Sequence, residues 1–328
     1  MRQPHLILAA AVVCGGAWLF FQNYRIAGLD HLELTPRGTA RRPGQADDFA
    51  PPPVQRASGT IRIASFNIQA FGPAKLGNPR IMNVLADAVG RFDIVAIQAV
   101  RAKTDDVLPR FVDLINSGGR HYDFVVGQRV GRADSGEQYA FIFDSASIEV
   151  DRSALYTVQD PDDLVEREPL VAWFRVRGPS PNQAFTFTLI DLHVAPDHTQ
   201  TELDAAAGVY RAVRDDGRGE DDVILLGDLN ADDHHLGRLG EISHLLPVVS
   251  GVPTNTRGDK QLDNILFSKA ASIEFTGRSG VFDLIREFTL TTDEALQVSD
   301  HMPVWAEFSI YEGGQGGRMA ARPAADTQ

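Results

Sequence analysis

The stretch Ser299-Asp300-His301-Met302-Pro303-Val304 decides the fold prediction for this chain. It places a carboxylate and a histidine directly before an apolar run, 302–308, that has the length of a β-strand. Polar side chains at strand ends are held in place by the sheet beneath them, which suits them to catalysis or binding. Polar groups at the ends of other predicted strands are therefore candidates for the same site.

Three upstream segments meet this condition. Phe66-Asn67-Ile68 and Leu192-His193-Val194 each end an apolar run, and Gly227-Asp228-Leu229-Asn230 ends a third. Side chains two apart on a strand share one face, so Asp228 and Asn230 present a carboxylate and an amide together. A lone Asp-x-Asn is more often a turn, and the pairing with a histidine at a neighbouring strand end is what favours a site.

Together these segments resemble the endonuclease/exonuclease/phosphatase superfamily, in its deoxyribonuclease I-like branch. The resemblance covers residues 61–308, and Arg167-Glu168-Pro169 and Gly131-Arg132 favour this branch. Gln261-Leu262-Asp263-Asn264 lacks the Trp-Cys-Asp-Arg element of inositol polyphosphate phosphatases. The resemblance implies a metal-dependent phosphodiesterase, in particular an exported endonuclease that acts on DNA rather than RNA, as a monomer.

The periodicity of apolar residues alternates between strands and helices. Helical spacing is clearest around 81–88, 107–115 and 203–213. Strands are expected at 61–67, 94–98, 122–126, 138–143, 171–176, 185–192, 223–226, 263–267, 272–276 and 302–308. This pattern suits an α/β fold of two packed sheets covered by helices. The resemblance selects the four-layer αββα sandwich of the deoxyribonuclease I-like fold.

The resemblance also implies roles for individual residues. His193 and His301 would face the scissile phosphate, oriented by Glu137 and Asp263 respectively, with Asp228 orienting the attacking water or the metal. A carboxylate that accepts one ring proton fixes the tautomer of a histidine and raises its basicity. Phosphate-binding and metal-binding roles fall to a further set: Asn230, Arg101 and Arg167 for phosphate, and Asn67 and Asp300 for the metal. Mg²⁺ or Mn²⁺ is the expected ion, because hard cations prefer oxygen ligands, and Ca²⁺ is a further candidate.

The segment Ile97-Gln98-Ala99-Val100-Arg101 departs from the family pattern. Its counterpart is an Ile-Gln-Glu-Val element whose Glu is the principal metal-binding carboxylate, and Ala99 has no oxygen to offer. We expect weakened metal binding and strongly impaired catalysis. Ser135 replaces an aromatic residue that packs against duplex DNA in close relatives. A non-catalytic phosphate-binding or nucleic-acid-binding protein and a phospholipid phosphodiesterase therefore remain alternatives.

Charge and acidic clusters limit the interpretation further. The net charge of −13 argues against binding nucleic acid by bulk electrostatics. A local cluster is needed, for which Arg101, Arg132 and Arg167 are candidates. Asp232-Asp233-His234-His235 is expected to be a solvated loop, and Glu220-Asp221-Asp222 is expected to lie in a loop before a buried strand.

The chain of 328 residues divides into four predicted parts. Residues 1–25, with an apolar run at 6–21, predict a signal anchor or signal peptide and hence an exported protein attached to a membrane or free in the periplasm or extracellular space. Residues 26–59 predict a flexible Pro-rich linker, 60–311 the endonuclease/exonuclease/phosphatase-like domain, and 312–328 a disordered tail. The only cysteine, Cys14, lies in the apolar run, so the domain has no disulfide.

Overall fold

A computed structural model describes residues 59–132 and 136–314. The predicted anchor or signal segment, most of the linker, Ser135 and the tail beyond Gly314 lie outside the described residues. Within the described ranges, no helix has both the length and the apolar character needed to cross a bilayer.

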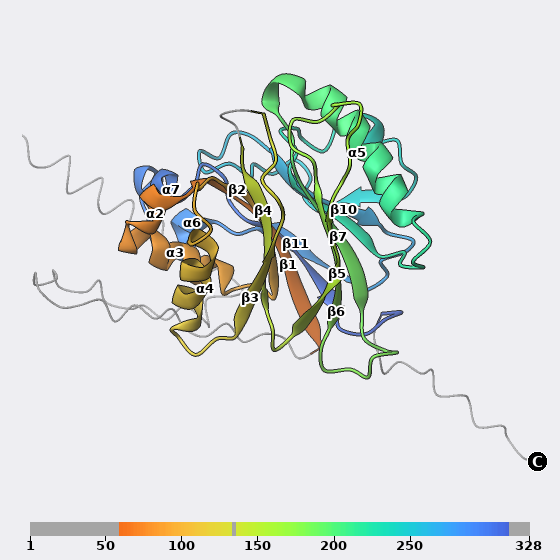
Figure 1. The fold of residues 1–328 in the computed structure, drawn as a ribbon, viewed down its shortest axis with the longest axis horizontal. Coiled ribbons are helices and arrows are strands. Elements are labelled where there is room, and N and C mark those ends of the chain that lie inside the picture. The colour runs from red at the N-terminus through yellow and green to blue at the C-terminus, as the bar shows by residue number, and fades with distance from the viewer. Residues whose placement is uncertain (1–58, 133–135, 315–328) are drawn as a thin grey trace, which may run out of the picture. The chain divides into compact units, whose positions relative to one another are not determined.

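Two mixed six-stranded sheets form the centre of the domain (Figure 1). The first has the order β11-β12-β1-β2-β4-β3 and the second β5-β6-β7-β8-β10-β9. The strands of the first sheet are β1 (Thr60–Phe71), β2 (Ile94–Val100), β3 (Tyr122–Val126), β4 (Gln138–Asp144), β11 (Phe275–Val281) and β12 (Val304–Ser309). Those of the second are β5 (Ile148–Thr157), β6 (Leu170–Val176), β7 (Thr186–His193), β8 (Val223–Asp228), β9 (Leu245–Pro247) and β10 (Asp263–Ser268).

Apolar side chains from both sheets fill the space between them. Phe141 of the first sheet packs edge-on against Phe174 of the second, with 5.3 Å between ring centroids. Phe174 stacks on Phe187 at 5.6 Å, which extends the aromatic contact along the second sheet. Such pairs add about 0.5–1.5 kcal/mol each to the stabilisation from burial alone.

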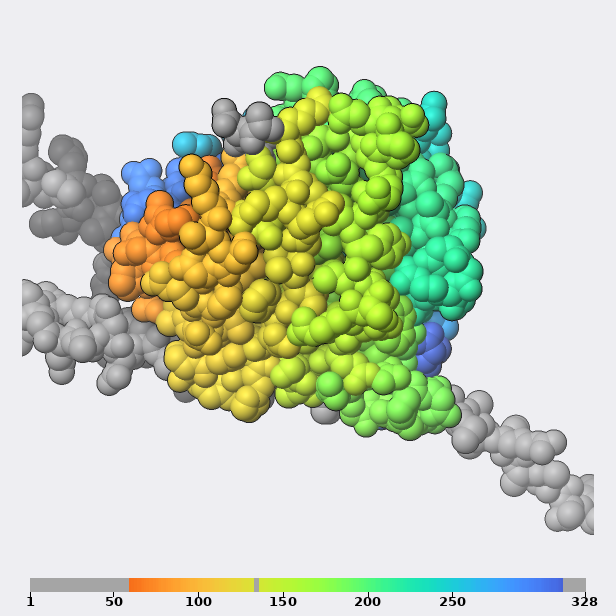
Figure 2. Space-filling view, viewed as in Figure 1, coloured from red at the N-terminus to blue at the C-terminus, as the bar shows by residue number. Residues whose placement is uncertain are grey.

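Helices cover the outer face of each sheet, which confirms the predicted four-layer sandwich. Leu85 and Phe111 lie in a core cluster with strand residues of the first sheet, and Leu203 and Tyr210 in one with strand residues of the second. Figures 1 and 2 show α3 and α4 on one side and α5 on the other. The helices are α2 (Pro73–Leu76), α3 (Pro79–Val89), α4 (Val107–Asn116), α5 (Thr199–Arg214), α6 (Leu284–Glu287) and α7 (Thr292–Val298), with 3₁₀ turns η3 (Pro196–His198) and η4 (Gly237–Leu239).

One strand prediction needs correction, and two strands, β5 and the short β9, were not predicted. The strand expected at 272–276 begins instead at Phe275, because Ser268 accepts the backbone N–H groups of Ala271 and Ser272 in a turn. Strand β5 was not predicted from the sequence. It is an edge strand with several consecutive exposed residues and a pairing irregularity between Asp151 and Tyr156, so it lacks regular alternation.

The topology brings the predicted site residues to one end of the sandwich. The parallel strands β7 and β8 end side by side, so that His193 lies opposite Asp228. The antiparallel strand β10 begins at this same edge, with Asp263 opposite Asp228 on its other side. In the facing sheet, Asn67 lies toward the end of β1, which pairs in parallel with β2.

Candidate active site

Asp228 lies at the centre of the polar cluster. Its side chain is buried, and its Oδ2 accepts a 2.9 Å hydrogen bond from Asn67 Nδ2, across the two sheets. Its Oδ1 accepts the backbone N–H of Asn230 at 3.0 Å. Gly227 makes this approach possible, because it has φ +149° and an added Cβ would lie 1.8 Å from the carbonyl oxygen of Leu192.

Two histidine–carboxylate pairs flank Asp228. His193 Nδ1 lies 2.7 Å from Glu137 Oε1, and His301 Nδ1 lies 2.9 Å from Asp263 Oδ2. The second nitrogen of each ring faces Asp228: Nε2 is 3.4 Å from Oδ2 in His193 and 3.5 Å in His301. The structure thus brings together five residues predicted as catalytic, each histidine with the carboxylate expected for it.

Electrostatics favours the charged form of both imidazoles. Burial opposes the charge on His301, but the carboxylates of Asp263 and Asp228 outweigh it and raise its pKa to about 10. The pKa of His193 is likewise raised, because the hydrogen bond to Glu137 and the charge of Asp228 outweigh burial. Burial would raise the pKa of Glu137, but His193 and two arginines hold it below its usual value.

The two arginines predicted to bind phosphate both contact Glu137. Arg101 Nη2 lies 3.3 Å and Arg167 Nε 3.4 Å from Glu137 Oε2. The Arg101 side chain is 40% exposed, whereas that of Arg167 is 6% exposed and also contacts Glu166 and the carbonyl of His193. Arg132 is not part of this group of contacts; it pairs with Asp163 at 3.0 Å.

The backbone beside the predicted metal-binding residues is held by side chains that the sequence did not single out for this role. Ser299 Oγ donates to the Asn67 carbonyl at 2.6 Å and accepts the His301 N–H at 3.1 Å. The ammonium of Lys75 donates to the carbonyls of Ile68 and Val298 at 2.7 and 2.6 Å. Burial lowers the pKa of Lys75 to about 8, although the charge of Asp300 opposes this shift.

Asp300 has a carboxylate oxygen that is free to bind a hard cation. Its Oδ1 is buried without a hydrogen-bond partner in the described structure and lies 3.8 Å from His301 Nε2. Asn67 offers an amide oxygen that already accepts the Gln69 N–H at 2.8 Å and has a second lone pair. This oxygen set fits Mg²⁺ or Mn²⁺, which commonly bind proteins through one or two carboxylates and keep several waters.

Ala99 occupies an irregular position on β2. Its φ is +62° and it is 2% exposed, and the pairing of β2 with β4 shifts register between Ile97 and Val100. For an L-residue this left-handed conformation costs roughly 1–2 kcal/mol. The preceding side chain, Gln98, is fixed by a buried 2.6 Å hydrogen bond to Asp191. The backbone at residue 99 therefore keeps a strained conformation, although the side chain there is only a methyl group.

Thr254 is a further site residue that the sequence did not indicate. Its hydroxyl donates to Asp263 Oδ2 at 2.7 Å and accepts the N–H groups of Leu262 and Asp263. It therefore holds the carboxylate that orients His301. A threonine nine positions from its partner, in an irregular segment, carries no periodic signal.

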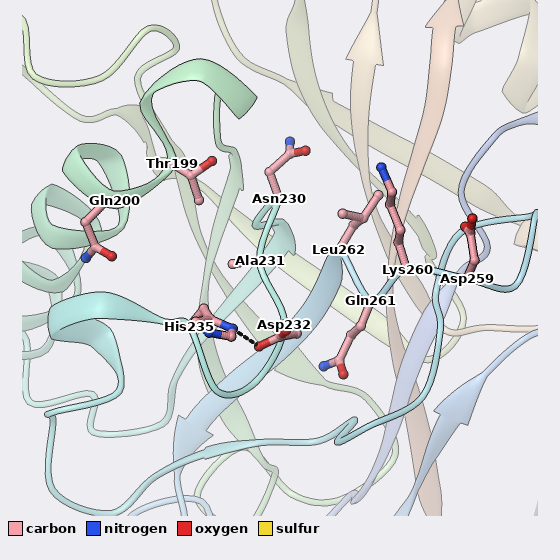
Figure 3. A pocket seen from close by; sticks show the side chains of 10 residues that line it. All are labelled: Thr199, Gln200, Asn230, Ala231, Asp232, His235, Asp259, Lys260, Gln261 and Leu262. Atoms are coloured by element: carbon pink, nitrogen blue, oxygen red, sulfur yellow. Dashed lines mark hydrogen bonds and ion pairs between the residues drawn. The ribbon is translucent and has the colours of Figure 1, made fainter.

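A pocket of about 470 Å³ opens beside Asn230 (Figure 3). Figure 3 shows its lining on three segments: the start of α5, the loop after β8 and the segment before β10. The lining residues are Thr199, Gln200, Asn230, Ala231, Asp232, His235, Asp259, Lys260, Gln261 and Leu262. The predicted loop at 232–235 is confirmed, and within it His235 Nδ1 lies 2.6 Å from Asp232 Oδ1.

Comparison with known proteins identifies the family. The model of the endonuclease/exonuclease/phosphatase family matches residues 64–301, which include both histidines and every carboxylate described above. The chain belongs to this family.

Within the family, the similar curated proteins are deoxyribonuclease I-like. Human deoxyribonuclease-1-like 2 is 32% identical over 280 residues, covering 76% of this chain and 92% of the human protein. Rat deoxyribonuclease gamma is 29% identical over 269 residues, covering 76% of this chain and 84% of the rat protein. The catalytic domain of human Nocturnin has the same fold, with a TM-score of 0.54 at 16% identity over 77% of this chain and 94% of that domain.

Proposed function

We propose that this protein is a metal-dependent phosphodiesterase that acts on DNA, and that Ala99 weakens its catalysis. The observation that carries the proposal is the convergence of two carboxylate-oriented imidazoles on Asp228. Phosphodiester hydrolysis needs an oriented water, stabilisation of charge on the phosphorane oxygens and protonation of the leaving oxygen. The described residues can supply each of these.

His193 and His301 supply the hydrogen-bond donors in this proposal. Their Nδ1 atoms are engaged by carboxylates, so Nε2 of each ring is the atom free to act on substrate. The raised pKa values favour the protonated form of both rings, in which Nε2 carries a proton that it can donate. They stabilise the developing negative charge, and one of them protonates the leaving oxygen, as a general acid.

Asp228 and Asn230 complete the reacting centre. Asp228 lies between the two rings and orients the attacking water, while the Asn230 amide binds a phosphate oxygen. Asp300 and Asn67 would hold Mg²⁺ or Mn²⁺, which supplies charge neutralisation at the phosphate. Without a carboxylate at residue 99, this ion loses an anionic ligand, so higher metal concentrations are needed to fill the site.

Because the chain as a whole is acidic, the contacts with the nucleic acid strand are assigned to individual positively charged side chains. Arg101 is the more exposed of the two arginines at Glu137 and contacts a backbone phosphate. Arg167 is nearly buried and chiefly positions Glu137 and the end of β7. The pocket beside Asn230, with Lys260 at its edge, lies where a nucleotide next to the scissile phosphate would extend. The names of the similar curated proteins favour DNA over RNA as substrate.

A substrate panel tests the proposal. Duplex DNA, single-stranded DNA, RNA and a phospholipid phosphodiester are incubated with the full-length protein and Mg²⁺, Mn²⁺ or Ca²⁺, and product ends are identified. Slow, metal-dependent cleavage of DNA is the expected result. Binding of DNA without cleavage at any metal concentration would instead establish a non-catalytic binding protein, which is the function that Ala99 alone favours. Cleavage of the phospholipid only would overturn the assignment of substrate.

Export is part of the proposal and rests on the apolar run at 6–21. A protein that acts outside the cytoplasm, attached through this segment or released by its cleavage, would meet extracellular nucleic acid. Cell fractionation with N-terminal sequencing of the mature protein decides between an anchor and a cleaved signal. Recovery of the intact chain in the cytoplasm would contradict export.

A further inference from the structure

A buried polar pair joins the two sheets beneath the reacting centre. Gln98 of β2 and Asp191 of β7 are both fully buried, and Gln98 Nε2 donates a 2.6 Å hydrogen bond to Asp191 Oδ1. Asp191 lies two residues before His193 on its strand, so these two side chains share one face of the sheet. One step further from the site on each strand, Ala96 and Leu189 belong to the apolar core between the sheets. The polar pair therefore lies between the apolar core and the site.

Each member of this pair has one oxygen that lacks a hydrogen-bond partner in the described structure. These oxygens are Gln98 Oε1 and Asp191 Oδ2, and each belongs to the same planar group as the atom that makes the 2.6 Å bond. The Gln98 amide also donates to Ser65 Oγ at 3.1 Å, which leaves its oxygen as the unused atom. An amide oxygen and an ionised carboxylate oxygen are both acceptors, so neither can satisfy the other. Buried oxygens are normally paired, and two unpaired acceptors on one bonded pair indicate a missing hydrogen.

The surroundings of Asp191 disfavour a negative charge on it. Burial raises the pKa of Asp191 well above its usual value; the hydrogen bond from Gln98 opposes this shift, and the negative charge of Glu137 adds to it. The nearby guanidinium of Arg167 contacts Glu137 instead. Tyr139 of β4 is the other titratable group beside Asp191, and burial raises the pKa of its hydroxyl, which stays neutral. A buried carboxylate without a cation is costly unless it is protonated.

We propose that Asp191 is protonated in the folded protein and forms a cyclic hydrogen-bonded pair with Gln98, and that this pair positions the end of β2 against the end of β7. Protonated Asp191 donates from Oδ2 to Gln98 Oε1, while its Oδ1 accepts from Nε2, so one proton satisfies both unpaired oxygens. Two parallel hydrogen bonds between planar groups fix their relative orientation as well as their distance.

The pair acts on the site through the two strands that carry it. Gln98 directly precedes Ala99, the position of the missing metal ligand, and Asp191 lies two residues before His193. The pair therefore sets the metal-binding side of the proposed site against the side that carries a general acid. Both Gln98 and Asp191 are positioning residues, because neither contacts the reacting groups. The positioning role rests on the proposed function, whereas the protonation of Asp191 does not.

Asp191→Asn tests the proton, because its amide keeps both hydrogen bonds to Gln98 and has no proton to lose. In the unaltered full-length chain the native state holds a proton that the unfolded state, with an Asp pKa of about 4, releases. This stabilisation is complete below about pH 4 and is lost as pH rises toward the raised pKa of the folded state. The unfolding constant of the unaltered chain should therefore rise relative to that of Asp191→Asn, by up to about tenfold per pH unit.

Chemical unfolding of both proteins at a series of pH values between 5 and 9 measures this ratio. Contributions from His301 and other titrating groups cancel in it, because both proteins contain them. A ratio that grows with pH is the expected result. A ratio that does not change with pH would show that Asp191 is ionised in the native state and would overturn the proposal.

Rates of DNA hydrolysis test the positioning role. Gln98→Met/Asp191→Leu replaces both partners by apolar side chains of similar shape, which leaves neither partner unpaired and can keep stability close to that of the unaltered chain. Its kcat should fall by about 10²-fold with little change in KM, because small displacements of reacting groups cost this much. Asp191→Asn should keep the rate. Thr188→Val is the matched control, because Thr188 is buried on β7 with an unpartnered hydroxyl and lies beside the start of β8, away from the site.

Three results would overturn the positioning role. The double variant could hydrolyse DNA at the unaltered rate, in which case the pair only stabilises the fold. Asp191→Asn or Thr188→Val could lose as much activity as the double variant, in which case the effect does not follow the hydrogen bonds. If the unaltered chain hydrolyses no DNA at any metal concentration, the proposed function fails and the positioning role with it, while the unfolding profiles still decide whether Asp191 is protonated.

Discussion

The side chains of His193 and His301 converge on a single atom, Oδ2 of Asp228, with Nε2–Oδ2 distances of 3.4 and 3.5 Å. His193 ends β7 of the second sheet and His301 precedes β12 of the first, and the two are 108 positions apart in the sequence. Each is fixed from behind by its own buried carboxylate. The protonation of the two rings therefore depends on three carboxylates, those of Glu137, Asp228 and Asp263.

Replacing either histidine should remove whatever hydrolysis the chain performs. General acid–base groups contribute about 10² to 10⁴-fold to rate, so His193→Ala and His301→Ala should each lower kcat by this amount. His121→Ala is the control, because His121 is exposed and directly precedes β3, outside the reacting centre and the pocket beside Asn230. Full activity in either variant, with an unchanged Tm, would show that the role assigned to that histidine is wrong.

The His301–Asp263 pair predicts a loss of stability at alkaline pH. The folded pKa of His301, about 10, lies above the unfolded value of roughly 6.5. The native state therefore holds a proton that the unfolded state releases between these values. The stabilisation is complete below pH 6.5 and is lost as pH rises toward 10.

Chemical unfolding at a series of pH values measures this effect. The double variant His301→Gln/Asp263→Asn removes both partners, and it should lack the part of the decline between pH 6.5 and 10 that the pair causes. Parallel pH profiles for the two proteins across this range would contradict the raised pKa.

Arg101 should contribute directly to DNA binding. Each phosphate contact releases a counterion, so Arg101→Ala should reduce the slope of log affinity against log salt by about 1. Arg110→Ala is the control, because Arg110 lies on α4 and pairs with Asp106 four residues earlier. Equal slopes for Arg101→Ala and the unaltered chain would show that Arg101 is an ordinary surface charge.

The strain at Ala99 can be separated from its chemistry. Glycine adopts positive φ without steric cost, so Ala99→Gly should relieve the strain and stabilise the fold by up to about 1 kcal/mol. It should not change the rate of hydrolysis, since glycine also offers no oxygen. Urea unfolding checks the predicted gain in stability, and initial rates measured on the same preparations check that hydrolysis is unchanged. A less stable glycine variant would mean that the left-handed conformation is not strained.

The fold could be predicted from sequence where apolar residues repeat regularly. The helical spacing of apolar residues around Leu85 indicated α3, and that around Phe111 indicated α4. The polar residues at the ends of β7 and β8 indicated the site. The irregular edge strand β5 was missed because its exposed and buried residues do not alternate. Pairing of His193 with Glu137, and of His301 with Asp263, was indicated by family resemblance and not by any local pattern.

Other contacts had no sequence signal because they join distant segments. Lys75 links the ends of β1 and α7, which lie more than two hundred positions apart. The segment containing Asp222 was predicted to be a loop before a buried strand, and it does precede β8, but no sequence pattern indicated that Asp222 itself is buried. Its proximity to Glu274 and Glu312 follows only from the packing of the two sheets, because Asp222 precedes a strand of the second sheet and the two glutamates flank strands of the first.

The most direct test of the central claim is the initial rate of DNA hydrolysis as a function of Mg²⁺ concentration for Ala99→Glu. A restored carboxylate should strengthen metal binding and raise the rate by orders of magnitude, because a bound metal stabilises the transition state by several kcal/mol. Ala99→Gln is the matched control, with nearly the same shape and no charge, and it should stay close to the unaltered chain. If Ala99→Glu and Ala99→Gln show equal rates and equal dependence on Mg²⁺, then the missing carboxylate does not limit this protein and the account is wrong.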